Sequence, residues 1–517
     1  MAMAQVSVVC LLVCLSLVGK VVAGRYPSAL GGGSVGIEEP RQVRSRSDFP
    51  EGFIFGTSSA AYQYEGAVKE GGRGPCIWDS ASHMPGIIHD NSTGDVANDH
   101  YHRYQEDIKL MADLEVGNYR FSIAWPRIFP DGRGPVANPE GIAFYNSIID
   151  SLLARGVEPF VCLSHYDLPQ TLQDEFGGWR SPQIVPLFRS FAEACFAAFG
   201  DRVKYWITFN EIHNFALKYT NFGCMASSGL CGTGNISTWV YTTGHHMLLS
   251  HASAVELYRT KFQAGQEGKI GIIADAQWYE PYSDSPADIE AVERMQAFQL
   301  QWVLDPIYYG RYPEVLVSRL GDRLPSFSER EAQSLKDSVD FVGLNHYTTH
   351  YAIDQSNSSA ASYMDSGAIS VGSKEGVPIG PLAGSTWLNI VPFGIHKILN
   401  YIRIRYNNPI IYITENGVDE DNDPATPLKV VLKDSYRIKY HLDYLSYVNA
   451  AIREGCDVRG YFIWSLLDNF EWDDGLSKRF GLYYVDYVNN MTRHAKDSAK
   501  WFKEFLRPLP QPKHAES

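Results

Sequence analysis

The chain has 517 residues, 45% of them apolar and 20% charged, and its 45 Lys and Arg against 59 Asp and Glu give a net charge of −14. This composition excludes a disordered chain, a collagen-like chain and a small disulfide scaffold. The acidic balance argues against nucleic acid as a partner, because phosphates are bound by clustered Lys and Arg. The length predicts two or three domains, or one large α/β barrel.

The N-terminus has the pattern of a secretory signal peptide, predicted over residues 1–24. Met1–Leu17 carries no charge and contains the apolar run Val6–Leu17, and the small residues Ala23 and Gly24 suit a cleavage site. A membrane anchor is the alternative, but the run is shorter than the ~20 apolar residues that a span needs. No later stretch is long and apolar enough, so no membrane span is expected. Residues 25–47 are predicted to be a flexible lead-in.

Eight short β-rich runs follow, separated by stretches with helical periodicity. Apolar residues recur on one face of the helical stretches Tyr104–Leu114 and Ala143–Leu153, and Pro186–Phe199 and Ser435–Ile452 are similar. The predicted strands are Phe53–Ser59, Val116–Trp125, Pro159–Tyr166, Tyr205–Glu211, Lys269–Asp275, Asp340–Thr348, Ile410–Gly417 and Val458–Leu466.

Strands that alternate with helices predict parallel β/α units, and eight units fit a single (β/α)₈ TIM barrel over residues 48–510, with a tail at 511–517. The alternative is an open doubly wound sheet, which predicts a Gly-rich phosphate turn after the first strand; none is present. The extra length is expected in long βα loops, chiefly Lys218–Trp239 and Tyr351–Pro381.

The C-terminal ends of the predicted strands are rich in carboxylates, amides and Trp. Active sites of such barrels lie at this end. Glu211 and Glu415 each directly end an apolar strand, and glycoside hydrolysis needs a carboxyl pair of this kind. Amides and carboxylates bind sugar hydroxyls, and Trp faces stack on the sugar ring, so these strand ends predict a sugar site.

The sequence also resembles a known family. TFNE (Thr208–Glu211) and ITENG (Ile413–Gly417) resemble the two signatures of family 1 glycoside hydrolases, the β-glucosidase family. The resemblance covers roughly Asp48 to Leu506, and the signal peptide together with the Cys224–Cys231 loop makes the chain look like a plant secreted member. The other motifs that agree, in family order, are SSAAYQYEG (Ser58–Gly66), YRFSIAWPRIFP (Tyr119–Pro130), LSHYDLP (Leu163–Pro169), GLNHYT (Gly343–Thr348), WSLLDNFEW (Trp464–Trp472) and RFGLYYVD (Arg479–Asp486).

The resemblance implies retaining hydrolysis of terminal β-D-glucosyl residues by double displacement, which places the two carboxyls about 5 Å apart. Glu211 would be the acid/base and Glu415 the nucleophile. A cation such as Arg120 would favour the ionised nucleophile, and Tyr347 would orient it. The residues expected to bind substrate are Gln63, His165, Asn210, Asn345, Tyr347, Trp387, Trp464, Glu471, Trp472 and Phe480; of these, Trp387 would lie on the aglycone side.

The sequence also indicates the compartment of the protein and whether it binds a metal or cofactor. Cys224 and Cys231 enclose a Gly- and Ser-rich loop, which favours a local disulfide in an oxidising compartment; two free thiols are the alternative. No CxxC or His/Cys cluster indicates a metal, and no cofactor is expected. The signal predicts the secretory pathway, with the cell exterior, cell wall or vacuole as destination. The candidate N-glycosylation sites are Asn91, Asn235, Asn357 and Asn490.

Two further functions stay open. A transglucosidase would use the same residues with a sugar or phenolic acceptor in place of water. A non-catalytic sugar-binding homologue would lack Glu211 or Glu415, and both are present. The sequence departs from the family pattern at Ile212, which stands where Pro is frequent. Glu211 itself argues against a thioglucosidase, in which Gln replaces the acid/base. The glycone is expected to be glucose, with fucose, galactose and mannose as alternatives.

Overall fold

The eight predicted strands form a closed parallel barrel in the computed structural model, which describes residues 39–225, 236–356 and 365–508. Each barrel strand pairs with the next along the chain, and the last closes the ring against the first. This arrangement confirms the predicted (β/α)₈ barrel. In chain order the barrel strands are β1 (Ile54–Ser58), β2 (Asn118–Ser122), β3 (Glu158–Ser164), β4 (Tyr205–Asn210), β5 (Lys269–Asp275), β7 (Phe341–Asn345), β12 (Ile411–Asn416) and β14 (Val458–Ile463).

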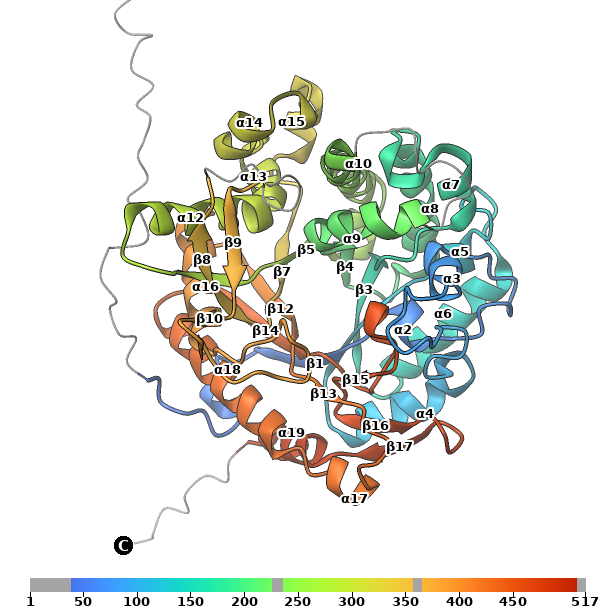
Figure 1. Cartoon of the computed structure of the whole chain (residues 1–517). Coiled ribbons are helices and arrows are strands. Elements are labelled where there is room, and N and C mark those ends of the chain that lie inside the picture. The colour runs from blue at the N-terminus through green and yellow to red at the C-terminus, as the bar shows by residue number, and fades with distance from the viewer. Residues whose placement is uncertain (1–38, 226–235, 357–364, 509–517) are drawn as a thin grey trace, which may run out of the picture. The chain divides into compact units, whose positions relative to one another are not determined.

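Helices surround the barrel, as Figure 1 shows. At the start of α6 (Pro139–Leu153) the Asn138 side chain accepts a hydrogen bond from the amide of Glu140, and Pro139 occupies the first position, so the helix begins there. Its predicted apolar face is buried against the barrel. The main helices are α4 (His100–Asp113), α6 (Pro139–Leu153), α8 (Ile184–Phe199), α10 (Ile236–Leu257), α12 (Pro286–Gln296), α13 (Trp302–Tyr309), α16 (Phe393–Arg405), α18 (Ser435–Arg453) and α19 (Asp497–Leu506).

Large side chains fill the interior of the barrel. A Cβ atom on Gly56 would lie 2.5 Å from the Phe462 ring, and one on Gly271 would lie 2.6 Å from the Phe341 ring. Glycine at these strand positions therefore makes room for a neighbouring aromatic ring. The buried cluster that closes the barrel consists of Phe160, Cys162, Ile207, Ile273, Phe341, Tyr412 and Phe462.

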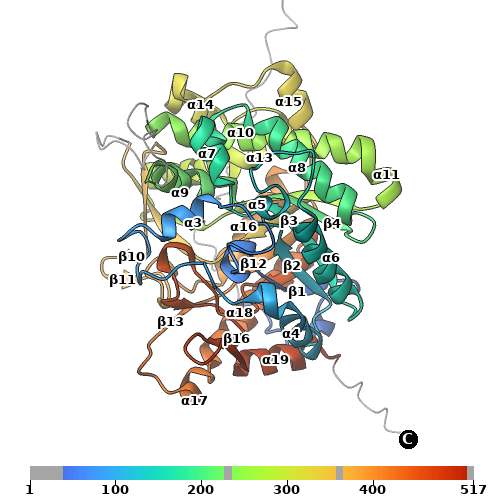
Figure 2. The ribbon, with the colours of Figure 1, turned by 90° about the vertical axis from the view of Figure 1, so that its right-hand side faces the viewer.

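The loops beyond the strands are partly regular. The stretch Lys218–Trp239 was expected to be a loop, but α9 (Ile212–Met225) and α10 occupy both of its ends. The apolar residues Phe215 and Tyr219 recur at helical spacing, and this pattern continues past Lys218. The sequence therefore favours a helix at the start of this stretch, where a loop was expected. Outside the barrel, β8 (Thr349–Asp354) joins β6 (Trp278–Pro281) and β9 (Ala368–Val371) in a small sheet. Figure 2 shows α14 (Glu314–Leu320) and α15 (Glu329–Leu335) on the side of the molecule opposite α19.

The packed body begins before the boundary that was expected at Asp48. Val43 and Ser45 are 3% and 1% exposed, and the amide of Val43 donates to Ser446 Oγ on α18 at 3.1 Å. The last residues of the predicted flexible lead-in are therefore ordered, because they cover α18. The predicted signal (1–24) and tail (511–517) lie outside the described residues. Among the described helices, none combines the length and apolarity that a membrane crossing requires.

Candidate active site

A cavity of about 930 Å³ opens at the C-terminal ends of the barrel strands. Both candidate catalytic carboxyls lie in its wall, Glu211 directly after β4 and Glu415 near the end of β12. Gln63 and Arg120 do not line the cavity, but they contact the lining residues Glu471 and Glu415. The other predicted substrate-binding residues all line the cavity: His165, Asn210, Asn345, Tyr347, Trp387, Trp464, Glu471, Trp472 and Phe480.

Glu415 is buried between a cation and a hydroxyl. The fully buried Arg120 donates from Nη1 to Glu415 Oε1 at 2.5 Å, and the Tyr347 hydroxyl donates to Oε2 at 2.6 Å. A charge-assisted bond on one oxygen and a second donor on the other fix the orientation of this side chain. Glu415 is therefore held in one orientation in the cavity wall.

Glu211 has a different environment. Asn345 Nδ2 donates to its Oε1 at 2.6 Å, and Asn214 Nδ2 donates to its Oε2 at 2.9 Å. Burial first, then the negative charges of Glu415 and Asp275, raise the pKa of Glu211 to about 7. A substantial fraction of Glu211 is therefore protonated near neutral pH. Two carboxyls in one cavity, one paired with a guanidinium and one that carries a proton near neutral pH, have the arrangement of a nucleophile and an acid.

Amide side chains connect the two carboxyls. Arg120 Nη2 donates to Asn210 Oδ1 at 2.7 Å, and Asn345 Nδ2 donates to the same oxygen at 3.0 Å. The Thr414 hydroxyl donates to Asn345 Oδ1 at 2.8 Å, which orients the amide so that its NH₂ group faces Glu211. His165 lies beside Arg120 and Asn210, and burial together with the Arg120 charge lowers its pKa, so its imidazole is neutral.

Another part of the cavity wall is formed by residues that follow β14, the strand next to β12 in the barrel. Trp464 and Trp472 present their rings there, and both stack near the imidazole of His165. Gln63 Nε2 donates to the backbone oxygen of Phe470 at 2.9 Å and reaches Glu471 Oε2 at 3.4 Å. Gln63 Oε1 is buried and has no hydrogen-bond partner among the residues that the structure describes. An unpaired buried acceptor next to the cavity suits a ligand hydroxyl.

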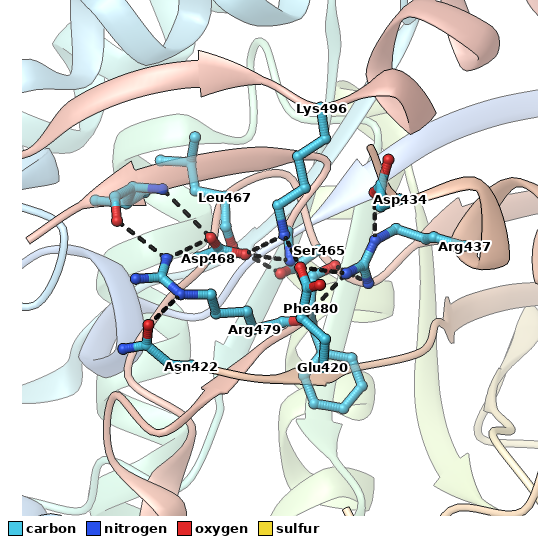
Figure 3. A network of polar contacts seen from close by, with 12 residues as sticks. Glu420, Asn422, Asp434, Arg437, Ser465, Leu467, Asp468, Arg479, Phe480 and Lys496 are labelled. Carbon is cyan, nitrogen blue, oxygen red and sulfur yellow. Dashed lines mark hydrogen bonds and ion pairs between the residues drawn. The ribbon is translucent and has the colours of Figure 1, made fainter. Parts of the chain in front are cut away.

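A buried ion network supports the segment between Trp464 and Trp472 (Figure 3). Asp468 accepts from Arg479 Nη1 at 2.6 Å and from Lys496 Nζ at 2.9 Å, and all three side chains are almost fully buried. Burial acts to raise the pKa of Asp468, but the charges of Lys496 and Arg479 outweigh it and lower this pKa. The network therefore joins the segment to β15 (Lys478–Arg479) and to the residues before α19.

Several cavity residues escaped the sequence analysis. The Tyr166 hydroxyl donates to Glu211 Oε2, and Asp275 accepts from His213 Nδ1 at 2.7 Å. Asp275 ends the fifth predicted strand. Its position at the opening of the barrel therefore follows from the rule that the C-terminal ends of the strands meet there. Tyr166 stands inside the motif LSHYDLP, and Asn214 lies one helical turn after Glu211, but neither position indicates the contact by itself.

Only some of the predicted glycosylation sites and disulfide cysteines lie within the residues that the structure describes. Asn91 and Asn490 are exposed, as a glycan acceptor must be. Cys231, Asn235 and Asn357 lie outside the described residues, as does the side chain of Cys224.

Comparison with known proteins decides the family. The model of "Glycosyl hydrolase family 1" matches residues 45–508. The chain belongs to glycosyl hydrolase family 1. This confirms the predicted family and, with the barrel and its carboxyl pair, glycoside hydrolase activity of the β-glucosidase type.

Curated relatives and solved structures agree. Beta-glucosidase 6 of Oryza sativa subsp. japonica is 52% identical over 90% of this chain and 91% of its own length. Coniferin beta-glucosidase of Pinus contorta is 51% identical over 89% and 92%. The crystal structure of rice Os3BGlu6 beta-glucosidase is 50% identical, with a TM-score of 0.87 over 90% of this chain and 100% of that chain. A mutant of the rice enzyme in a covalent complex with Glc has a TM-score of 0.86, with the same identity and coverage.

Proposed function

We propose that the protein hydrolyses β-glucosides with retention, with Glu415 as nucleophile and Glu211 as acid/base. One observation carries this assignment: the two carboxyls share a cavity, yet Glu415 is paired with the guanidinium of Arg120 and Glu211 has a pKa of about 7. Retaining hydrolysis needs this division, because one carboxyl attacks as an anion while the other delivers a proton.

In the first step a Glu415 oxygen forms a bond to the anomeric carbon as the bond from that carbon to the leaving oxygen breaks. Glu211 gives its proton to the leaving oxygen, so the aglycone departs as a neutral alcohol or phenol. In the second step a water oxygen bonds to the anomeric carbon and its proton passes to Glu211. The ester bond breaks as the bond to water forms, and Glu415 returns as a carboxylate.

The environment of Glu211 suits both of its roles. Glu415 is uncharged while it forms the ester, so one of the charges that raise the pKa of Glu211 disappears. The pKa of Glu211 then falls, and the ionised form that accepts a proton from water becomes more populated. Tyr166 and Asn214 donate to Glu211 Oε2 and keep this carboxyl in place through both steps.

The pH dependence follows from the pKa of Glu211. The acid must be protonated in the free enzyme, so kcat/KM for a glucoside with a poor leaving group is expected to fall as the pH rises through about 7. A pH–rate profile measures this directly, with thermal unfolding curves at each pH as the control. A profile that stays flat up to pH 9 would show that another group supplies the proton.

The cavity has room for an aglycone beyond the sugar. Its volume of about 930 Å³ lies at the upper end of the roughly 300–1,000 Å³ that holds drug-sized ligands. Trp387 is 41% exposed and its ring lies 5.8 Å from that of Tyr347. Further apolar side chains in the wall are Leu217, Val240, Met295, Phe298 and Trp302. Aryl β-glucosides and short oligosaccharides are therefore the substrate class.

A screen of 4-nitrophenyl β-glycosides and short β-linked glucose oligosaccharides tests the function. We expect the glucoside to be cleaved, with the fucoside, galactoside and mannoside as the comparison that ranks the glycones. Adding an alcohol acceptor separates the two reactions, because a transglucosidase forms the glucosylated acceptor instead of glucose. If the protein cleaves none of these glycosides, the proposed function is wrong.

We also propose the secretory pathway as the compartment, with the cell exterior, cell wall or vacuole as destination. The signal pattern at residues 1–24 supports it, together with the exposed sequons at Asn91 and Asn490. A Cys224–Cys231 disulfide remains a prediction that fits this compartment.

A further inference from the structure

A surface segment, His89–Ser92, lies against the turn that follows Glu471 and Trp472. The backbone amide of His89 donates to the oxygen of Asp473 at 2.8 Å. The amide of Leu476 donates to Asp90 Oδ2 at 2.8 Å and also lies 3.1 Å from Ser92 Oγ. Asp90 is exposed and is not part of the cavity wall, so its contacts are to the outer side of this turn.

The carboxylate of Asp90 is itself held in place. Its Oδ1 accepts from the amide of Ser92 at 2.9 Å and from the Ser92 hydroxyl at 2.6 Å. Oδ2 is thereby directed to Leu476. A carboxylate oriented by its own loop loses less side-chain entropy when it binds a backbone amide than a freely rotating one does.

The turn has a backbone shape that needs such support. Trp472 has a φ of 51°, in the left-handed region that residues other than Gly rarely adopt, and Gly475 has a φ of 63°. A Cβ atom on Gly475 would lie 2.0 Å from Asp90 Oδ1, so the two segments are in close contact. Within the turn, the amide of Glu471 donates to the oxygen of Gly475 at 2.6 Å. A movement of Gly475 therefore moves Glu471.

We propose that Asp90 is a positioning residue of the sugar pocket, which acts through the turn Asp473–Leu476 on Glu471 and Trp472. This role rests on the proposed function, in which those two side chains contact the sugar. The turn has other ties: Lys218 Nζ pairs with Asp473 Oδ1 at 2.6 Å, and Asn422 Nδ2 donates to the oxygen of Leu476 at 2.9 Å. Loss of Asp90 removes one contact that holds the turn, while the contacts of Lys218 and Asn422 remain.

The test compares Asp90→Ala and Asp90→Asn with Asn91→Gly as the matched control. Asn91 is the adjacent exposed residue, and its φ of 58° is one that glycine adopts freely. We expect Asp90→Ala to raise KM for an aryl β-glucoside roughly five- to tenfold with a smaller change in kcat, the size of one lost charge-assisted hydrogen bond. Asp90→Asn keeps an acceptor oxygen and should recover much of the loss, while Asn91→Gly should behave as the wild type.

A double-mutant cycle with Glu471→Gln shows whether the effect passes through Glu471. If it does, Asp90→Ala changes KM much less in the Glu471→Gln background than in the wild type. Equal changes in both backgrounds, an unchanged KM with a lowered Tm, or the same loss in Asn91→Gly would each overturn the proposal. Calorimetric binding of 1-deoxynojirimycin to the same variants separates this outcome from a failure of the proposed function, because it reports the sugar pocket without any turnover.

Discussion

Glu415→Gly is expected to lower hydrolysis of aryl β-glucosides by about 10⁵-fold or more, the order of loss when a covalent nucleophile is removed. The carboxylate that forms the bond to the anomeric carbon is then absent. Arg120 and Tyr347, which donate to Glu415 in the wild type, cannot replace it, because neither is a nucleophile in its protonated form. Glycine also leaves a space in which a small anion can bind.

Azide or formate should restore turnover of an activated aryl glucoside by this variant. Azide enters from the side that Glu415 occupied, so the product is expected to be α-glucosyl azide. Glu415→Gln serves as the control, because its amide fills the same space and leaves no room for the anion. A β-configured azide, or equal rescue of both variants, would show that another group attacks first.

Glu211→Gln is expected to separate substrates by their leaving groups. Alkyl glucosides and oligosaccharides need a proton on the departing oxygen, so their kcat/KM should fall by about 10²–10⁴-fold, the usual contribution of general acid catalysis. A 2,4-dinitrophenyl glucoside leaves without protonation, so its first step should change far less. The measurement is kcat/KM for a series of aryl glucosides plotted against the pKa of the leaving phenol.

The slope of that plot is the decisive quantity. It should be steeper for Glu211→Gln than for the wild type, because charge on the leaving oxygen is no longer neutralised. Asp275→Asn is an informative comparison: it retains Glu211 but removes one of the charges that raise its pKa. That variant should therefore lose activity at a lower pH than the wild type while keeping the wild-type slope. The same slope in Glu211→Gln and in the wild type would refute the assignment of the acid.

The barrel could be predicted because its strands are short apolar runs, each with its own local signal. The face of α6, with Phe144, Ile148 and Leu152, was equally visible as a helical period and is buried as expected. The two carboxyls could be found because strand ends in a parallel barrel converge on one opening, whatever their separation along the chain. Asp275 obeys the same rule, because it ends β5, and its place at the opening is therefore predictable from the sequence.

Contacts between distant loops left no comparable signal. Asp90 and Leu476 are far apart along the chain, and nothing in HDNS or DDGL indicates that an exposed Asp accepts from that amide. The sequence does not indicate the ion network of Asp468, Arg479 and Lys496 either. Each of these charged residues, taken alone, predicts a solvent-exposed position. The ordered start at Val43 depends on the surface of α18, which no local pattern of residues 25–47 describes.

The nucleophile can be identified most directly by trapping the intermediate. A 2-deoxy-2-fluoro-β-glucoside with a good leaving group slows both steps, and the second step becomes slow enough for the sugar ester to accumulate. Peptide mapping by mass spectrometry then locates the label. The structure predicts one sugar per chain, on the peptide that contains Glu415, and no label in Glu415→Gln. A label on Glu211 or on any other residue, or inactivation without a covalent sugar, would contradict the two-step mechanism proposed for this cavity.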